Sequence, residues 1–256
     1  MIGMLEDLRK FTYDVYIDFL KLLRSKYRIV TFSEASEANC PYLIMRHDVD
    51  ASLDAALTMA KIETGLNIRS TYFVLFSHKL YNLLETDSLH TLREISELGH
   101  EIGLHYDLEA YEGYHRDLKE TLEDEARLLE KLLNKRVVSI ACHNPSTLKS
   151  GDPFKNIPKY INAYNPSLYD LYVSDSCRAW TMEDLRRLLK FDYKRAQLLV
   201  HPVFWTEVRC NRDAVLERLF QLVEKKNHDY KYKWLELWHK NPRVKQYEVC
   251  DREVGN

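Results

Sequence analysis

The sequence is poor in the residues that break regular structure, with only 7 glycines and 7 prolines among 256 residues. It contains no internal repeat, no low-complexity tract and no linker rich in proline or glycine. A single continuous domain over residues 1–256 is therefore the expected organisation. No run of about eighteen apolar residues occurs, so we expect no membrane-spanning helix.

The N-terminal residues and the cysteines both favour a cytoplasmic protein. The first residues carry acidic side chains where a signal peptide needs positive charge followed by an apolar run. The 5 cysteines are odd in number, and none stands in a C-x-x-C pair. Reduced thiols are the simplest interpretation, and a thiolate zinc site is not expected.

Neither sign of charge is in excess, because 37 Lys and Arg residues face 39 Asp and Glu residues. General nucleic-acid binders usually carry a basic excess, so no nucleic-acid partner is expected. A small neutral substrate such as a sugar is compatible with this balance. The hydrophobic share of 45% and the charged share of 30% are those of a globular protein that can bury a core without disulfides.

Short apolar runs alternate with segments of helical periodicity along most of the chain. This order of strand and helix predicts an α/β fold with a parallel sheet. Gly65 and Gly99 are expected to end two of the helices, because glycine accepts the left-handed conformation that follows a helix. Strands are expected at 28–32, 41–45, 70–76, 101–105, 137–141, 171–173 and 196–200, and helices at 5–25, 52–64, 89–98, 118–133 and 213–240.

Polar residues that can do chemistry recur directly after the predicted strands. In a barrel the carboxyl ends of parallel strands share one rim, which is where active sites form. This recurrence predicts one site built from residues that lie far apart in the sequence. The residues concerned are His47, Asp48, Asp50, His105, His143, Asp175 and His201.

Asp48 and Asp50 alternate with Val49, so both carboxylates are expected on the same side of an extended segment. Two carboxylates close together repel unless a cation lies between them or one is protonated. One interpretation is a metal ligand beside a general base. The other is a strand end capped by an ion pair with Arg46, and the motif alone does not separate the two.

Three histidines follow predicted strands: His105, His143 and His201. A neutral imidazole suits a divalent metal such as zinc, and a histidine can also donate a proton in catalysis. Hydrogen bonding to the backbone is the structural alternative for each of them. Gly103 precedes His105 by two residues and permits a close approach of a neighbouring segment.

Four motifs follow one another between residues 42 and 205. Asp48 and Asp50 end the first strand of the set; segment 65–74 is GLNIRSTYFV, segment 98–105 is LGHEIGLH, and segment 198–201 is LLVH. This ordered set resembles the polysaccharide deacetylase family (carbohydrate esterase family 4), and we interpret the chain as a divergent member.

The resemblance implies a distorted (β/α) barrel with about seven parallel strands. It also implies a divalent metal, usually zinc, that activates water. Matching positions imply Asp48 as the general base, with Asp50 and His105 as metal ligands. His201 would protonate the departing amine. The implied reaction is hydrolysis of an N-acyl group, typically acetyl, from an amino sugar.

Three departures from the family pattern affect the expected site. Val49 separates two aspartates that are adjacent in the family. Glu109 stands where the family has a second histidine, and His143 stands where it has an arginine. We therefore expect His143 as the third metal ligand, with Glu109 as the alternative. Asp175 and Trp180 take the place of the family's Asp–Trp motif, which implies that Asp175 orients a catalytic partner.

Arg178, Trp180, Trp205 and Tyr106 are the candidate substrate-binding residues, because they offer charge and stacking to a sugar; packing is the alternative for the tryptophans. The expected partner is a small carbohydrate, an amino sugar of an intracellular glycan precursor such as a nucleotide-linked or lipid-linked one. Two other functions stay open. One is an amide hydrolase of the same fold that acts on a non-sugar C–N bond. The other is a catalytically inactive barrel that binds a carbohydrate or a protein partner.

Overall fold

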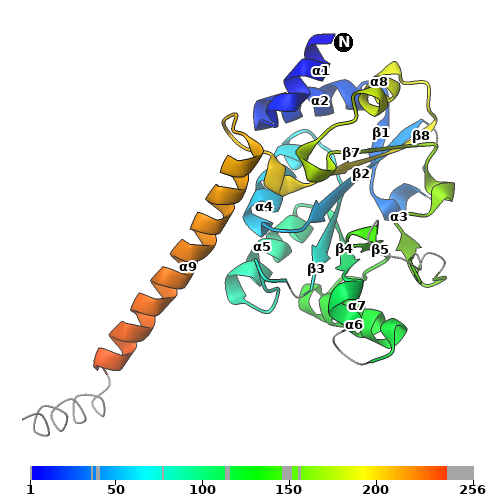
Figure 1. The fold of residues 1–256 in the computed structure, drawn as a ribbon. Coiled ribbons are helices and arrows are strands. Elements are labelled where there is room, and N and C mark those ends of the chain that lie inside the picture. Colours follow the sequence, from blue (N-terminus) through cyan, green and yellow to red (C-terminus); the bar gives the residue numbers. More distant parts are fainter. Residues whose placement is uncertain are drawn as a thin grey trace, which may run out of the picture. The chain divides into compact units, whose positions relative to one another are not determined.

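The computed structural model describes residues 2–35, 37–38, 41–76, 78–112, 116–145, 152–154 and 157–240 (Figure 1). The chain divides into two compact units, Met1–Cys210 and Asn211–Asn256. The expectation of one domain over all residues stays a prediction.

Parallel strands form the centre of the first unit. The order along the sheet is β6-β5-β4-β3-β2-β8-β7, and β1 pairs with β2 beside this path. The described pairings are all parallel. The sheet curls into a half-barrel with helices around it, which confirms the expected distorted (β/α) barrel (Figure 1). The strands are β1 Arg28–Val30, β2 Tyr42–Val49, β3 Thr71–Leu75, β4 Glu101–Tyr106, β5 Ser139–Cys142, β6 Ile161–Asn162, β7 Leu171–Ser174 and β8 Arg195–Val200.

Helices connect most of these strands, as the alternating sequence pattern predicts. Among the described residues, short 3₁₀ helices lie at Leu8–Lys10, Pro166–Leu168, Ser176–Arg178 and Pro202–Phe204. The α-helices of the first unit are α1 Ile2–Asp7, α2 Tyr13–Arg24, α3 Phe32–Ala35, α4 Leu53–Gly65, α5 Thr86–Glu97, α6 Leu108–Glu112, α7 Leu118–Leu133 and α8 Met182–Lys190.

The predicted single helix at 5–25 is wrong, because the chain breaks at Phe11. Phe11 adopts a left-handed conformation with φ of 54°. Thr12 then forms a parallel bridge with Thr206, in which the Tyr13 N–H donates to the Thr206 carbonyl at 3.0 Å. The periodicity of the apolar residues continues across this break, so the sequence pattern does not reveal it.

The two glycines differ in how they end their helices. Gly99 has φ of 95° and follows α5 directly after its capping residue, as predicted. Gly65 is instead the last residue of α4, and the left-handed residue there is Asn67, with φ of 51°. Asparagine is the commonest substitute for glycine in this conformation, which explains the shift of two residues.

Residues of β2 alternate between two cores. Ile44 packs with Phe73 and Ala141 on the inner face, which we define as the face that also carries Asp48. Met45 packs on the outer face with Leu198. All eight residues of the strand are buried, as in a sheet that is covered on both sides.

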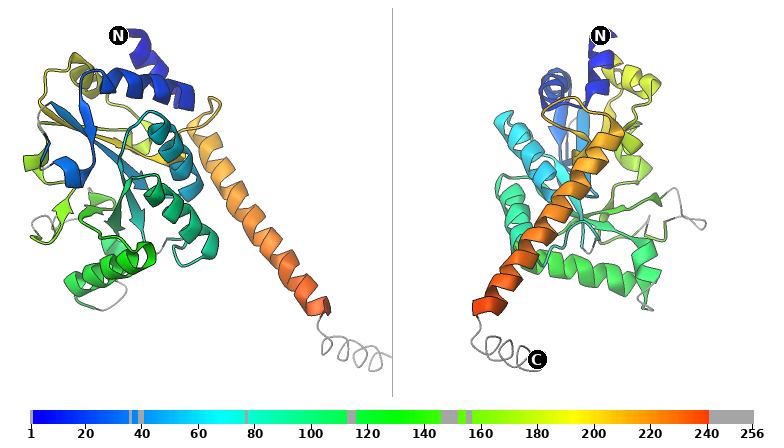
Figure 2. Two further views of the ribbon diagram at one scale, coloured as in Figure 1. Left: turned by 180° about the vertical axis from the view of Figure 1, so that it is seen from behind. Right: turned by 60° about the vertical axis from the view of Figure 1, so that its left-hand side comes forward.

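Helices α4 and α5 lie side by side against the outer face, which both views of Figure 2 show in cyan and green-blue. Ala56 and Ala60 of α4 and Leu92 of α5 pack there with Val74 and Leu104 of the sheet. The two helices thereby cover the outer face of the sheet. The polar side chains lie at the carboxyl ends of its strands, which these helices leave uncovered.

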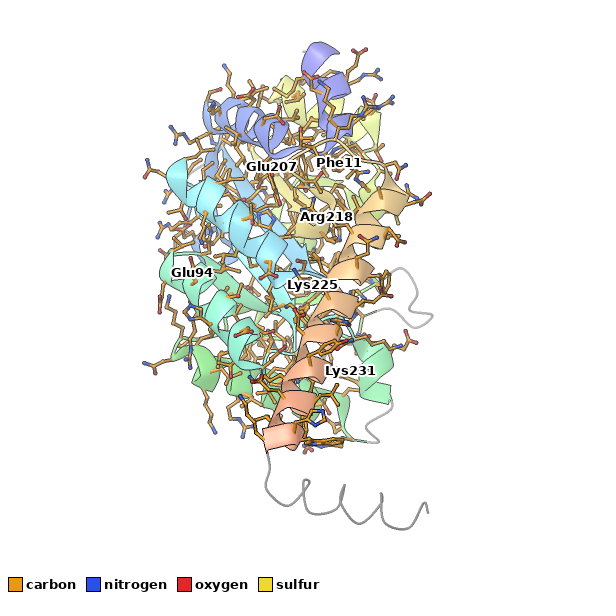
Figure 3. The ribbon with its side chains drawn as sticks, turned by 90° about the vertical axis from the view of Figure 1, so that its left-hand side faces the viewer. Phe11, Glu94, Glu207, Arg218, Lys225 and Lys231 are labelled. Atoms are coloured by element: carbon orange, nitrogen blue, oxygen red, sulfur yellow. The ribbon has the colours of Figure 1, made fainter. Side chains whose placement is uncertain are left out.

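The described part of the second unit begins at Asn211 and contains one long helix, α9 Arg212–Lys240. Its charged side chains occur along its whole length, as Arg218, Lys225 and Lys231 illustrate in Figure 3. Among the helices within the described ranges, none is both long enough and apolar enough to cross a membrane.

Candidate metal centre and active site

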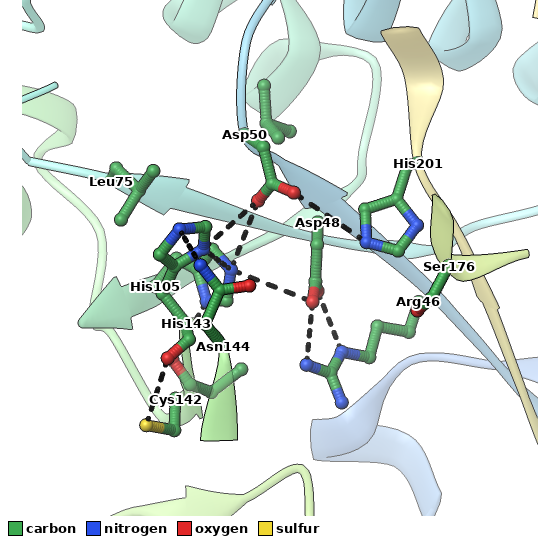
Figure 4. Close-up of polar contacts among 12 residues, drawn as sticks. Arg46, Asp48, Asp50, Leu75, His105, Cys142, His143, Asn144, Ser176 and His201 are labelled. Atoms are coloured by element: carbon green, nitrogen blue, oxygen red, sulfur yellow. Dashed lines mark hydrogen bonds and ion pairs between the residues drawn. The ribbon is translucent and has the colours of Figure 1, made fainter. Parts of the chain in front are cut away.

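Strands β5, β4, β2 and β8 bring the predicted site residues to one edge of the sheet, and β3 lies between β4 and β2 (Figure 4). The register places His105 of β4 opposite Leu75 of β3 on one side and Ala141 of β5 on the other. Asp48 lies one strand further, near the end of β2, and His201 directly follows β8. The strand ends therefore meet at one rim, as the sequence predicts.

Asp50, His105 and His143 form a group of three potential metal ligands. The His105 Nε2 atom lies 3.3 Å from Asp50 Oδ1 and 3.3 Å from His143 Nδ1. The third side of this triangle, from His143 Nδ1 to Asp50 Oδ1, measures 3.5 Å. Three ligand atoms of two residue types thus point at one common centre.

The triangle has the size that a zinc ion requires. Zinc bonds of about 2.0–2.1 Å in a regular tetrahedron place the ligand atoms about 3.3–3.4 Å from one another. The Asp50 Oδ1 atom is buried and accepts no hydrogen bond from the described residues. A buried carboxylate oxygen without a donor is costly, and a cation would satisfy it. The residues present therefore fit a divalent metal.

The tautomer of His105 suits a ligand. Its Nδ1 atom lies 2.9 Å from the carbonyl oxygen of Ala141, which can only accept a hydrogen bond. Nδ1 therefore carries the proton, and the lone pair of Nε2 faces Asp50 and His143. Burial raises the pKa of Asp50, but the contacts with the two imidazoles outweigh it and hold this pKa well below its usual range.

Asn144 contacts the outer nitrogen of His143. Its side-chain amide lies 2.8 Å from His143 Nε2, and Asn144 has a left-handed φ of 46°. The amide nitrogen Nδ2 is the Asn144 atom at this distance from Nε2. An amide turned by 180° would present its oxygen instead, and the Nε2–H of His143 would then donate to that oxygen while Nδ1 serves as a ligand. Burial lowers the pKa of His143, but the close contact with the Asp50 carboxylate and its negative charge outweigh burial and raise this pKa.

Asp48 is held by Arg46 in a two-point ion pair. The Arg46 Nε and Nη2 atoms donate to the two carboxylate oxygens at 2.7 Å each, and neither residue is exposed to any extent. Burial raises the pKa of Asp48, but the adjacent guanidinium outweighs this and lowers it. Asp48 Oδ2 still lies 3.6 Å from His105 Nε2. Both interpretations of this motif thus have support: Asp48 pairs with Arg46, and it also borders the three-ligand group.

His201 is held in place by Asp175. The His201 Nδ1–H donates to Asp175 Oδ1 at 2.6 Å, and the His201 backbone N–H donates to the same carboxylate. The indole N–H of Trp205 donates to the other oxygen at 3.0 Å. His201 Nε2 is left 3.7 Å from Asp50 Oδ2. Burial lowers the pKa of His201, but Asp175, Asp50 and Asp48 outweigh it and raise this pKa to about 9.

Three of the four candidate substrate-binding residues are buried, and the fourth is half-buried. Trp205 is only 1% exposed and packs against Tyr16, and Trp180 is buried with its indole N–H on the carbonyl of Leu8. Tyr106 is also buried, on the outer face. Arg178 is half-buried and its guanidinium lies over an aromatic ring. Trp205 reaches the site only through its hydrogen bond to Asp175, and the burial of both indoles agrees with the packing alternative for the tryptophans.

Glu109 is not part of the ligand group. It lies in the short helix α6, where it is exposed and its backbone N–H donates to Asp107. Of the two candidates for the third ligand, His143 is the one that the fold places beside Asp50.

Two residues near the site had no signal in the sequence. Tyr164 accepts a hydrogen bond from Arg46 at 2.9 Å, and its ring lies against the guanidinium. His78 follows β3, and its ring centroid lies 6.5 Å from that of His143. Both come from loops that the strand pattern does not describe, so only the fold reveals that they are near.

No family model matches the sequence, and no curated protein matches it. Solved structures do match. One is a CE4-family pseudoenzyme of Bacillus anthracis in a mutant form with restored enzymatic activity, with 14% identity and a TM-score of 0.45. This match covers 74% of the present chain and 64% of the other.

Two further matches are the Streptococcus pyogenes deacetylase PplD in complex with acetate and a polysaccharide deacetylase from Bacillus cereus. The first has 18% identity and a TM-score of 0.38, covering 53% of this chain and 61% of that one. The second has 10% identity and a TM-score of 0.41, covering 72% and 88%. The CE4 family is the one that the sequence motifs resemble.

Proposed function

We propose that this chain is a divergent polysaccharide deacetylase, a metal-dependent hydrolase that removes an N-acyl group, typically acetyl, from an amino sugar. The observation that carries the proposal is the triangle of Asp50, His105 and His143, with sides of 3.3–3.5 Å. It is flanked by Asp48 on one side and by His201 on the other. A structural role alone would not require five titratable side chains at one buried rim.

Asp50, His105 and His143 would hold the cation, and zinc is the ion that their nitrogen and oxygen atoms suit. A bound divalent ion supplies Lewis acidity, which acidifies water and polarises a carbonyl oxygen. Asp48 is the proposed general base. Its lowered pKa keeps it ionised at neutral pH, and the two bonds from Arg46 fix its orientation.

His201 is the proposed general acid. Its Nδ1–H bond to Asp175 fixes the ring so that Nε2 faces the centre of the site. With its pKa raised to about 9, the imidazolium form prevails at neutral pH and Nε2 carries a proton to donate. The acceptor of this proton is the nitrogen of the departing amine.

Three half-buried tyrosines support a sugar as the substrate: Tyr164, Tyr169 and Tyr172. The positive charge of Arg46 acts on all three and counteracts the rise in their pKa that burial causes. The ring centroids of Tyr169 and Tyr172 are 5.9 Å apart. Such partly exposed rings offer apolar faces and hydroxyl groups together, which is the surface that a sugar ring needs. The finer proposal is a small amino sugar of a cytoplasmic glycan precursor, nucleotide-linked or lipid-linked.

The first test is the metal content of the protein by mass spectrometry, after purification without added metal. We expect one zinc per chain in the wild type and a loss of this zinc in His143→Ala. The matched control is Glu109→Ala, which should keep the metal because Glu109 lies outside the ligand group. Metal retained in His143→Ala but lost in Glu109→Ala would reverse the assignment.

The second test is hydrolysis of N-acetyl sugars beside simple amides. Preference for the sugars would support the deacetylase, and preference for the amides would point to another C–N bond. A metal-free wild type that takes up no zinc, yet binds sugars, would replace the enzyme with the carbohydrate-binding barrel.

A further inference from the structure

Six apolar or aromatic residues and one asparagine recur along helix α9 at alternating steps of four and three residues. They are Leu216, Phe220, Val223, Asn227, Tyr230, Trp234 and Leu237, which we call the 216–237 stripe. Alternating steps of four and three give an average repeat of 3.5 residues. This is the heptad repeat of helices that form coiled coils, and residues 216–237 span about three heptads.

The stripe is exposed rather than packed. Phe220 is 53% exposed and Tyr230 is 62% exposed, and Leu216, Trp234 and Leu237 are exposed as well. Fully covered aromatic side chains bury roughly 150–250 Å² each. Two such stripes placed together would therefore remove on the order of 1,000 Å² from water, which is the lower end for a stable interface.

The composition of α9 favours a helical partner over a lipid surface. The helix contains 7 Lys and Arg residues and 5 Asp and Glu residues, so it has little excess of positive charge. Helices that lie on anionic membranes are usually rich in basic residues along one face. In addition, Asn227 lies at the middle of the stripe, where a bilayer would offer its amide no partner.

We propose that α9 pairs with α9 of a second copy of this chain, as an antiparallel two-stranded coiled coil. In the antiparallel register centred between residues 228 and 229, each layer between Phe220 and Leu237 combines one aromatic and one smaller side chain. Phe220 meets Leu237 of the partner subunit, and Trp234 meets Val223 of the partner subunit. Large and small side chains in one layer fill space evenly, whereas a parallel pair would stack Trp on Trp and Tyr on Tyr.

The polar residues agree with this register. Asn227 meets Tyr230 of the partner subunit, which gives the buried amide a hydroxyl group to bond. Beside the stripe, Glu224 faces Lys231 of the partner subunit, and the two-fold axis repeats this pair. On the other side of the stripe, Lys226 lies near Lys233 of the partner subunit. These two positive charges repel each other, but they are exposed and salt screens the repulsion.

The decisive experiment is the solution mass of the full chain by light scattering over a range of concentrations. We expect a molecular mass of twice the 30.4 kDa of one chain. Phe220→Asp should raise the dissociation constant by about 100-fold or more, because it buries a charge in the apolar layer. Tyr232→Asp is the matched control: Tyr232 is 55% exposed but lies outside the stripe, so its variant should dimerise normally.

Lys231→Glu distinguishes the two orientations. In the antiparallel pair it sets two glutamates against each other and weakens the dimer, and adding Glu224→Lys restores it. In a parallel pair residue 231 faces Lys226 of the partner subunit instead, so Lys231→Glu would strengthen the dimer. The expected result is weakening by about tenfold, with rescue in the double variant.

A strengthened dimer in Lys231→Glu would overturn the antiparallel register. A wild-type chain that remains at 30.4 kDa at every concentration would overturn self-association altogether. Flotation of this monomer with anionic vesicles would then assign the stripe to a membrane surface. None of the substituted residues belongs to the proposed metal centre, so each variant should retain its zinc content.

Discussion

At the scale of single residues, the two-point bond between Arg46 and Asp48 is the feature with the clearest consequence. Lysine offers one compact charge in place of the planar fork, so Arg46→Lys should leave Asp48 ionised but free to rotate. We expect kcat to fall by about 10- to 100-fold, with the zinc content unchanged. A kcat equal to that of the wild type would mean that Asp48 acts without this constraint, or does not act as the base.

The bond between Asp175 and His201 leads to a prediction about the leaving group. Asp175→Asn keeps the shape of the side chain but removes the charge that orients and supports the imidazolium. Turnover should fall by about 10²–10⁴-fold for a substrate with a basic leaving amine. The loss should be much smaller for an N-acetyl aniline with a weakly basic amine, because that leaving group needs little protonation.

Asp48→Asn supplies the contrast to this variant. A defect in the base should slow both classes of substrate alike, while metal analysis shows whether the centre is intact. If Asp175→Asn also slows both classes to the same degree, His201 does not protonate the leaving group.

Only part of the site could be predicted from the residues themselves. Asp50, His105 and His143 could be predicted, because a position at the end of a strand can be recognised from the local sequence. The fold adds only that these strand ends lie close together. The burial of Trp180 and Trp205 could not be predicted. It depends on packing against the N-terminal segment, where Trp180 bonds to Leu8, a residue 172 positions away.

At the scale of elements, the spacing between β3 and β4 depends on Gly103. A Cβ atom there would lie 2.4 Å from the ring of Phe73 and 2.8 Å from the Ser139 hydroxyl. Gly103→Ala should therefore lower the free energy of unfolding by about 1–3 kcal/mol, because the packed ring has to move. The sequence predicts that a neighbouring segment approaches Gly103 closely, and in the structure the ring of Phe73 is the group that does so.

Gly65→Ala is the control for this substitution. None of the residues that the structure describes lies within 4 Å of a Cβ atom at Gly65, and Gly65 is the last residue of α4. Alanine has the better helix propensity, so this variant should be neutral or more stable by up to about 1 kcal/mol. Urea unfolding measures both. Equal stabilities for the two variants would show that Phe73 yields without cost.

The elements themselves were largely predictable from periodicity. Helix α7 begins and ends at the predicted residues, 118 and 133, because an Asp117 cap opens it and Asn134 closes it. Strand β2 extends four residues further than its apolar run, through Val49. It continues because β3 and β8 pair with these polar residues, and pairing between distant strands cannot be seen in a local pattern.

At the scale of the whole first unit, one buried carboxylate joins elements that are distant in the sequence. Glu63 of α4 is fully buried and accepts hydrogen bonds from Tyr16 of α2 and Tyr72 of β3. It also contacts Ser70 at 2.8 Å, His47 of β2 at 2.7 Å and His100 at 3.7 Å. His47 precedes Asp48, so this cluster also fixes the strand that carries the active-site carboxylates.

This cluster makes the stability of the unit depend on pH. Burial raises the pKa of Glu63, but the charge and hydrogen bond of His47 outweigh it, and the pKa falls to about 2 from 4.5. A carboxyl group whose pKa is lower in the folded than in the unfolded chain stabilises the fold at pH values above its pKa in the unfolded chain. That stabilisation, on the order of 3 kcal/mol, is lost as the pH falls from 4.5 to 2. Glu63→Gln should therefore be much less stable than the wild type at pH 7, and the difference should shrink through this range.

Glu125 provides a control of opposite sign. Burial raises its pKa to about 7, so the fold favours its protonated form, and that contribution is lost as the pH rises from 4.5 to 7. Glu125→Gln should therefore gain stability relative to the wild type at neutral pH, where Glu63→Gln loses it. Urea midpoints at pH 7, 5 and 3 for the three proteins measure both trends. Parallel pH profiles for the wild type and Glu63→Gln would mean that Glu63 does not carry its charge in the folded chain.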